Sequence, residues 1–121
     1  MPYFDKERPF VKYWFASANG TPVRTFNETI SERNQDSLEK EGGACIMYTH
    51  FGSSFYKEGK LNAEFKRLME RLSRKNGWFV PVSTIIDCIL QQRGDYQISP
   101  LERSEIELKW LFGKVRTNSI P

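Results

Sequence analysis

The stretch that decides the predicted fold is GGACIMYTHFG, which runs from Gly42 to Gly52. Two glycines open it, a short apolar run follows, and it ends beside His50, the only histidine of the sequence. A short apolar run between glycines is typical of a strand that is buried on both faces of a sheet. In a parallel sheet, ligands bind at the carboxyl end of such strands. We therefore expect a buried strand at about residues 44–49, with Thr49 and His50 at the ligand-binding edge.

Strands and helices alternate on both sides of this stretch. Aromatic residues over 10–16 and the apolar run 78–82 predict two further strands. Capping residues and apolar residues at helical spacing predict helices over 31–40, 62–75, 83–94 and 99–116. This order predicts an α/β fold with three parallel strands alternating with helices, plus a C-terminal helix. We expect one domain over residues 1–121, with residues 1–9 as an irregular arm.

The composition indicates a globular protein and excludes few functions. The 121 residues carry a formal net charge of +3, which is too small to indicate a nucleic-acid partner by itself. No apolar run is long enough to span a membrane, and the first residues lack the apolar segment of a signal peptide, so we expect a cytoplasmic location. The two cysteines, Cys45 and Cys88, fit no metal-binding spacing, and we expect both to be reduced thiols in the core.

Residues 42–90 resemble the last two strand-helix units of the polysaccharide deacetylase (NodB homology) domain. The resemblance lies in the order of the motifs: a glycine, a strand closed by histidine, a loop and helix, a glycine-aromatic strand, and a last helix. In this sequence the motifs are Gly43, Ile46 to His50, Asn62 to Lys75, Gly77 to Val82, and Ser83 to Ile89 with Asp87. The chain is then similar to the C-terminal part of an irregular (β/α) barrel.

This resemblance implies metal-dependent N-deacetylation of carbohydrates, with His50 at the position of the family's general acid. Family members use a divalent metal such as zinc, held by an Asp and a His-x-x-x-His pair that lie earlier in their fold. A chain with one histidine has no counterpart of that pair, so we expect no metal site and no cofactor in this chain. The resemblance therefore predicts a deacetylase-like fragment that is catalytically incomplete alone, and it leaves open whether the chain is an enzyme.

The candidate site gathers at the end of the central strand. We expect His50 to be catalytic, since an imidazolium can give a proton to an amine leaving group at neutral pH. We expect a carbohydrate to contact four neighbours: Tyr48, Thr49, Phe51 and Trp78. The alternatives remain open that the histidine only caps the strand and that the aromatic rings only pack the following loop.

A second hypothesis is a non-catalytic α/β module for interaction or assembly. Three parallel strands cannot close a barrel, so we expect either a homo-oligomer or a missing N-terminal part of the barrel. The helix over 99–116 has one apolar stripe and a second apolar patch at Ile106 and Trp110, and a helix with two apolar sides needs two neighbours. The aromatic segment 10–16 is another expected contact surface. A basic cluster within 66–75 could bind nucleic acid, but it alternates with acidic residues and is more typical of a solvated helix face.

Overall fold

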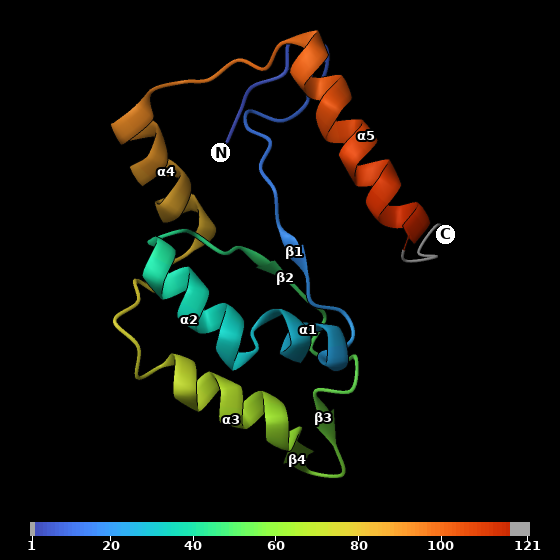
Figure 1. Cartoon of the computed structure of the whole chain (residues 1–121), viewed down its shortest axis with the longest axis vertical. Helices are drawn as coiled ribbons and strands as arrows, with labels where there is room; N and C mark the ends of the chain where they lie inside the picture. Colours follow the sequence, from blue (N-terminus) through green and yellow to red (C-terminus); the bar gives the residue numbers. More distant parts are fainter. Residues whose placement is uncertain (1, 117–121) are drawn as a thin grey trace. The chain divides into compact units, whose positions relative to one another are not determined.

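The computed structural model describes residues 2–116, which group into two compact units (Figure 1). We call Ala16–Thr84 the central unit and residues 2–15 together with 85–116 the terminal unit. Met1 and residues 117–121, which the sequence analysis included in the single domain, lie outside the described residues. Each unit is described by itself.

The central unit combines three short helices with two pairs of very short strands. The helices are α1 (Val23–Thr29), α2 (Glu32–Glu41) and α3 (Ala63–Leu72), and the strands are β1 (Ala18–Asn19), β2 (Met47–Tyr48), β3 (Tyr56–Lys57) and β4 (Lys60–Leu61). Strands β1 and β2 are parallel, with Ala18 opposite Met47, and β3 and β4 form an antiparallel hairpin. Helix α4 (Val82–Arg93) begins at the end of this unit.

A cluster of aromatic rings forms the core of the central unit. Phe26 of α1, Phe55 before β3 and Phe65 of α3 pack edge to face, with ring centroids 5.3, 5.4 and 5.1 Å apart. This geometry adds to the hydrophobic gain because the positive edge of one ring meets the negative face of the next. Leu68 and Phe55 are the most deeply buried side chains, and Val23 and Ile30 complete the cluster. The core therefore joins α1, α3 and the segment before the hairpin.

The predicted α/β fold with three parallel strands is wrong. The expected strand over 10–16 contributes only a single bridge at Trp14, and the expected strand over 44–49 shortens to β2. The expected strand over 78–82 does not form, since α4 already begins at Val82. A single parallel pair, β1 with β2, and one hairpin remain, and the described residues form no barrel-like arrangement.

The physical reason is that the apolar runs lack the neighbours that buried parallel strands require. Gly42, the first residue of the central stretch, caps α2 in the left-handed conformation, with φ of +64°. Cys45, expected in the core, is exposed, and Cys88 is only partly buried. In the run over 78–82, Pro81 has no backbone N–H to donate to a neighbouring strand, and it directly precedes the first turn of α4.

Two elements of the central unit were not predicted. Helix α1 lies in a segment for which no helix or strand was predicted, because it is only seven residues long and follows Pro22. The β3–β4 hairpin lies in a segment expected to be a loop. It turns at Glu58 and Gly59, whose φ angles of +51° and +79° fit the tight turn that matches strand twist.

The terminal unit is organised around the N-terminal segment and α5 (Pro100–Arg116). Backbone hydrogen bonds join Phe4 to Tyr96 and Ile98, at 2.8 and 3.0 Å. Asp5, only 3% exposed, accepts a hydrogen bond from the Arg103 guanidinium at 3.2 Å. A buried carboxylate needs such a partner, because leaving it unpaired is strongly unfavourable. The arm at the start of the chain is therefore fastened to the first turns of α5.

The start of α5 has the capping pattern that the sequence predicted. The Ser99 side chain accepts a hydrogen bond from the Glu102 backbone N–H at 3.3 Å, and Glu102 accepts one from the Ser99 backbone N–H at 3.0 Å. This reciprocal pair satisfies two backbone donors at the helix start. Hydrogen bonds from Ser99 and Tyr96 also lower the pKa of Glu102 to about 2. Pro100 occupies the first helical position, where its missing N–H has no cost.

Gln35 is the polar group that joins the helices of the central unit. Its side chain is 4% exposed, and its Nε2 donates to the carbonyl oxygens of Ile30 and Leu68 at 2.8 and 3.1 Å. Its Oε1 accepts a hydrogen bond from Arg71 at 3.0 Å. One amide therefore links α2 to the end of α1 and to α3.

Replacing this amide tests its contribution to stability. We expect Gln35→Leu to lower the free energy of unfolding by about 1–3 kcal/mol, because buried acceptors lose their donor and Arg71 loses its acceptor. Gln91→Leu, at an exposed position of α4, is the matched control and should change stability by less than about 0.5 kcal/mol. Urea unfolding of both variants measures the difference. Equal stability of Gln35→Leu and the unsubstituted chain would contradict this role.

Candidate functional site

The predicted catalytic residue lies in the turn after β2, at the end of the parallel strand pair. The Nε2 atom of His50 is 2.7 Å from the Tyr48 hydroxyl, and the two rings meet edge to face at 5.0 Å. Both side chains are exposed. Thr49 points to the other side and donates its hydroxyl hydrogen to the Gly20 carbonyl at 3.1 Å. The structure therefore brings Tyr48 and His50 together and uses Thr49 to hold β2 beside the residue that follows β1.

The two other predicted contacts of a carbohydrate are not gathered with this pair. Phe51 is 63% exposed but packs its edge against the core ring of Phe55, with centroids 5.2 Å apart. Trp78 is 61% exposed and lies in the segment between α3 and α4. Within the described residues, no hydrogen bond or ring contact joins Trp78 to Tyr48, His50 or Phe51. The arrangement offers a hydrogen-bonded Tyr–His pair on an open surface.

An exposed Tyr–His pair can supply only part of the chemistry of amide hydrolysis. Tyrosine and histidine can exchange a proton with a bound ligand, but hydrolysis of an amide also needs an activated water. Residues 2–116 contain no group of three or more His, Cys, Asp or Glu side chains placed to hold a metal ion. The assignment of His50 as general acid stays a prediction.

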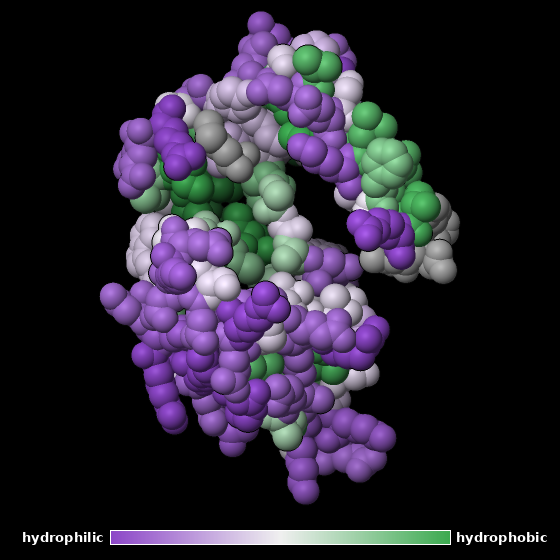
Figure 2. Space-filling view, viewed as in Figure 1, coloured by the Kyte–Doolittle hydropathy of each residue, from purple (hydrophilic) through white to green (hydrophobic). Residues whose placement is uncertain are grey.

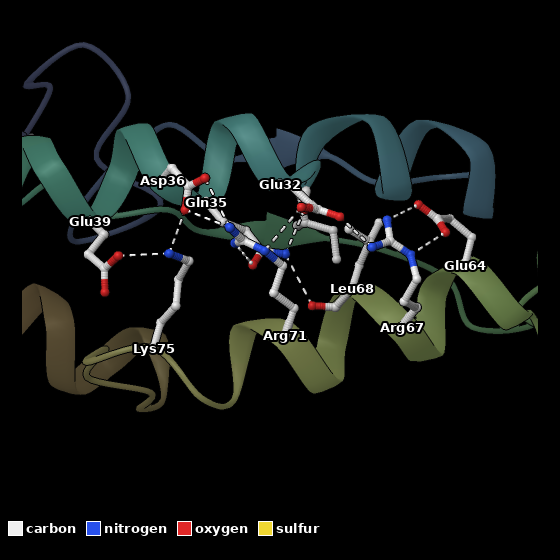
Figure 3. Close-up of polar contacts among 10 residues, drawn as sticks. Glu32, Gln35, Asp36, Glu39, Glu64, Arg67, Leu68, Arg71 and Lys75 are labelled. Carbon is white, nitrogen blue, oxygen red and sulfur yellow. Dashed lines mark hydrogen bonds and ion pairs between the residues drawn. The ribbon is translucent and has the colours of Figure 1, made fainter.

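The basic cluster of α3 faces the acidic side chains of α2 (Figure 3). Carboxylates spaced along α2 alternate with bases spaced along α3 and just after it. The ion pairs are Glu32 with Arg67 and Arg71, Asp36 with Arg71 and Lys75, and Glu39 with Lys75.

These ion pairs change the expected role of the cluster. The Lys75 ammonium lies 2.6 Å from Asp36 and 2.7 Å from Glu39. Hydrogen bonds from Lys75 and then Arg71 lower the pKa of Asp36, and the hydrogen bonds of Lys75 to Asp36 and Glu39 raise the pKa of Lys75. The positive charge of Arg71 and Lys75 is thus compensated by α2, so it offers little attraction for a phosphate backbone. The polar contacts hold two helices together.

The terminal unit has a different kind of surface, an apolar face along α5. Five apolar residues recur at helical spacing on one side of this helix, as the sequence predicted, and Figure 2 shows hydrophobic residues along most of its length. All five side chains are exposed, from 46% to 72%. We call this set the α5 stripe: Leu101, Leu108, Leu111, Phe112 and Val115.

The α5 stripe is separate from the side of the helix that holds the N-terminal segment. Arg103 contacts Asp5, and Glu107 pairs with Arg8, on one side of α5. At 100° per residue, these two positions lie roughly a third of a turn from the centre of the α5 stripe. The second apolar patch, Ile106 and Trp110, lies on the far side of Arg103 and is also exposed.

Some of these features could have been found in the sequence. Glu32 and Asp36 are four residues apart, and so are Arg67 and Arg71, which is the spacing of side chains on one helix face. Matching the two patterns would have predicted that α2 and α3 pair. Tyr48 and His50 are two residues apart, so a strand places them on the same face. In contrast, no local signal showed that Asp5 would be buried against Arg103, 98 residues later.

Comparisons of the chain with models of known protein families, with curated proteins and with solved structures gave no match. The resemblance to the deacetylase domain therefore has no support beyond the motifs quoted for it. Among the described residues, no helix has the length and apolar character needed to cross a lipid bilayer.

The deacetylase hypothesis can be tested on the purified chain. We expect no release of acetate from an N-acetylglucosamine oligomer above the blank, with or without added zinc, because a sequence with one histidine cannot supply the His-x-x-x-His pair that holds the family's metal. The variants His50→Ala and Tyr48→Phe should give the same result as the unsubstituted chain. Turnover that depends on His50 would contradict this expectation and would restore the catalytic role.

Proposed function

We propose that this chain is a non-catalytic assembly module that associates with a second copy of itself through the α5 stripe. The observation that carries the proposal is the exposure of the whole stripe, including Leu108 at 53% and Phe112 at 64%. Single exposed apolar residues are normal on protein surfaces, but a continuous apolar face marks an interaction site. The proposal includes the cytoplasmic location that the composition favours.

The energetic argument follows from the size of the stripe. Burying one leucine or phenylalanine side chain stabilises a complex by about 1.5–3 kcal/mol. Because the five side chains of the stripe are only 46% to 72% exposed, ten of them in a dimer contribute roughly 9–17 kcal/mol, against an association cost of about 4–15 kcal/mol. The α5 stripe can therefore support a stable dimer if both copies use it.

The way in which α5 is attached to the N-terminal segment also favours binding. The capping pair of Ser99 and Glu102 fixes the start of α5, and the contacts of Asp5 with Arg103 fasten its first turns to the N-terminal segment. A helix that is formed before it meets its partner loses less conformational entropy on binding. The stripe is thus presented on a preorganised element.

A second copy is the partner that the charges of α5 fit best. The first half of the helix is acidic and the second half is basic, so one helix supplies the complement of the other. Twofold association of identical chains is also the commonest form of protein oligomer. The deacetylase-like function remains the alternative, and the His50 experiment above tests it.

Substitutions on the stripe test the proposal. We expect Leu108→Gln combined with Leu111→Gln to raise the dimer Kd at least about 100-fold, since each substitution removes an apolar side chain from both copies. Lys109→Gln lies between them on a different side of the helix and should change the Kd less than about threefold. Glutamine forms helices well, so α5 itself should persist. Sedimentation equilibrium over a concentration series measures both values.

Three results would overturn the proposal. The first is a monomeric mass at every concentration for the unsubstituted chain. The second is an unchanged dimer Kd in the double variant. If the double variant instead lowers the melting temperature of a monomer, the stripe is covered within the chain, which also contradicts the proposal.

A further inference from the structure

We infer that the two α5 helices pair in an antiparallel orientation, with Leu108 of one copy opposite Leu111 of the other. This inference rests on the proposed function, because it specifies how the second copy sits on the α5 stripe. Three features of α5 support it: the distribution of charge, the spacing of the apolar residues, and the position of one small residue.

The charge along α5 favours the antiparallel orientation. Residues 102–107 contain three glutamates and one arginine, a net charge of −2. Residues 109–116 contain two lysines and one arginine, a net charge of +3. An antiparallel pair places the acidic half of each helix against the basic half of the other, whereas a parallel pair places like charges together. The two helix dipoles point in opposite directions in the antiparallel pair, so the positive end of each helix lies beside the negative end of the other.

The spacing of the apolar residues gives the register. Leu101, Leu108 and Val115 recur every seven residues, and Leu111 follows Leu108 by three, which is the pattern of a seam between two helices. An antiparallel pair centred between positions 109 and 110 places Leu108 opposite Leu111 twice. The same register places Ser104 opposite Val115.

The small side chain of Ser104 is suited to the position opposite Val115 in the seam. It occupies the position three residues after Leu101, where a larger apolar residue would be usual. Its hydroxyl donates a hydrogen bond to the Pro100 carbonyl of its own helix at 2.9 Å. The polar group is therefore satisfied when the partner helix covers it, and its small size leaves room for Val115.

The register also brings one pair of opposite charges together on each side of the twofold axis. Glu107 and Lys114 flank the seam at equivalent heptad positions, which meet across an antiparallel pair. Glu107 also pairs with Arg8 of its own chain, so the contact with Lys114 would extend an existing ion pair. In a parallel pair, position 107 would instead face position 112, which is a phenylalanine.

Crosslinking of two singly substituted chains tests the orientation. Ser104→Cys and Val115→Cys are made separately in a full-length background with Cys45→Ser and Cys88→Ser, with tags of different mass. A short bis-maleimide is added to each protein alone and to the mixture. We expect a crosslinked dimer that contains one chain of each kind, and no dimer from Ser104→Cys alone, because its two thiols would be about 16 Å apart along the axis.

Each of the other possible results shows which part of the proposal is wrong: the orientation, the register or the dimer itself. A crosslinked dimer from Ser104→Cys alone would show parallel helices and overturn this inference, while the proposed function would stand. A dimer by sedimentation without the mixed crosslink would overturn the register. A monomer by sedimentation in the unsubstituted chain would overturn the proposed function as well.

A charge exchange gives a second measurement that does not depend on thiols. We expect Glu107→Lys and Lys114→Glu each to raise the dimer Kd by roughly tenfold, since each sets like charges across the seam. The double variant should bind more tightly than either single variant, because the pair is then present with reversed signs, while the lost contact of position 107 with Arg8 keeps its Kd above that of the unsubstituted chain. Failure of the double variant to recover would contradict the antiparallel register.

Discussion

The rest of this account depends on one constraint, which is that the apolar face of α5 has no cover among the described residues. The helix is fixed on its other side, where Asp5 is buried against Arg103. A buried carboxylate is maintained only with its partner, so this contact sets which side of α5 faces the N-terminal segment. The side chains of the α5 stripe are exposed, and a second copy that covers them would remove them from water. The proposed assembly function is based on this exposed face of the terminal unit.

The central unit has a core of its own, although Phe51, Trp78 and Phe79 remain exposed on it. Its core is the edge-to-face cluster of Phe26, Phe55 and Phe65, and Gln35 supplies the buried hydrogen bonds between its helices. The ion pairs of α2 with α3 use charges that could otherwise have attracted an anionic partner. What remains exposed at the end of β2 is the Tyr48–His50 pair. The contrast between the units directs attention to α5.

Helices were predicted from the sequence better than strands, for a physical reason. Helix starts and ends have local chemical signals, and capping residues flank three of the predicted helices: Gly42 after α2, Asn62 before α3 and the Ser99–Glu102 pair at the start of α5. A strand is stable only with neighbours, and an apolar run does not say whether they exist. The runs over 10–16 and 78–82 therefore resembled buried strands but are largely exposed. The position of His50 at a strand end was predicted, whereas its surroundings depend on contacts between distant segments.

The mass of the unsubstituted chain in solution tests the central claim most directly. Sedimentation equilibrium at micromolar concentrations should give twice the chain mass of 14.2 kDa, with dissociation on dilution. A single species of 14.2 kDa over the whole concentration range would contradict the account, because the α5 stripe would then need no second copy.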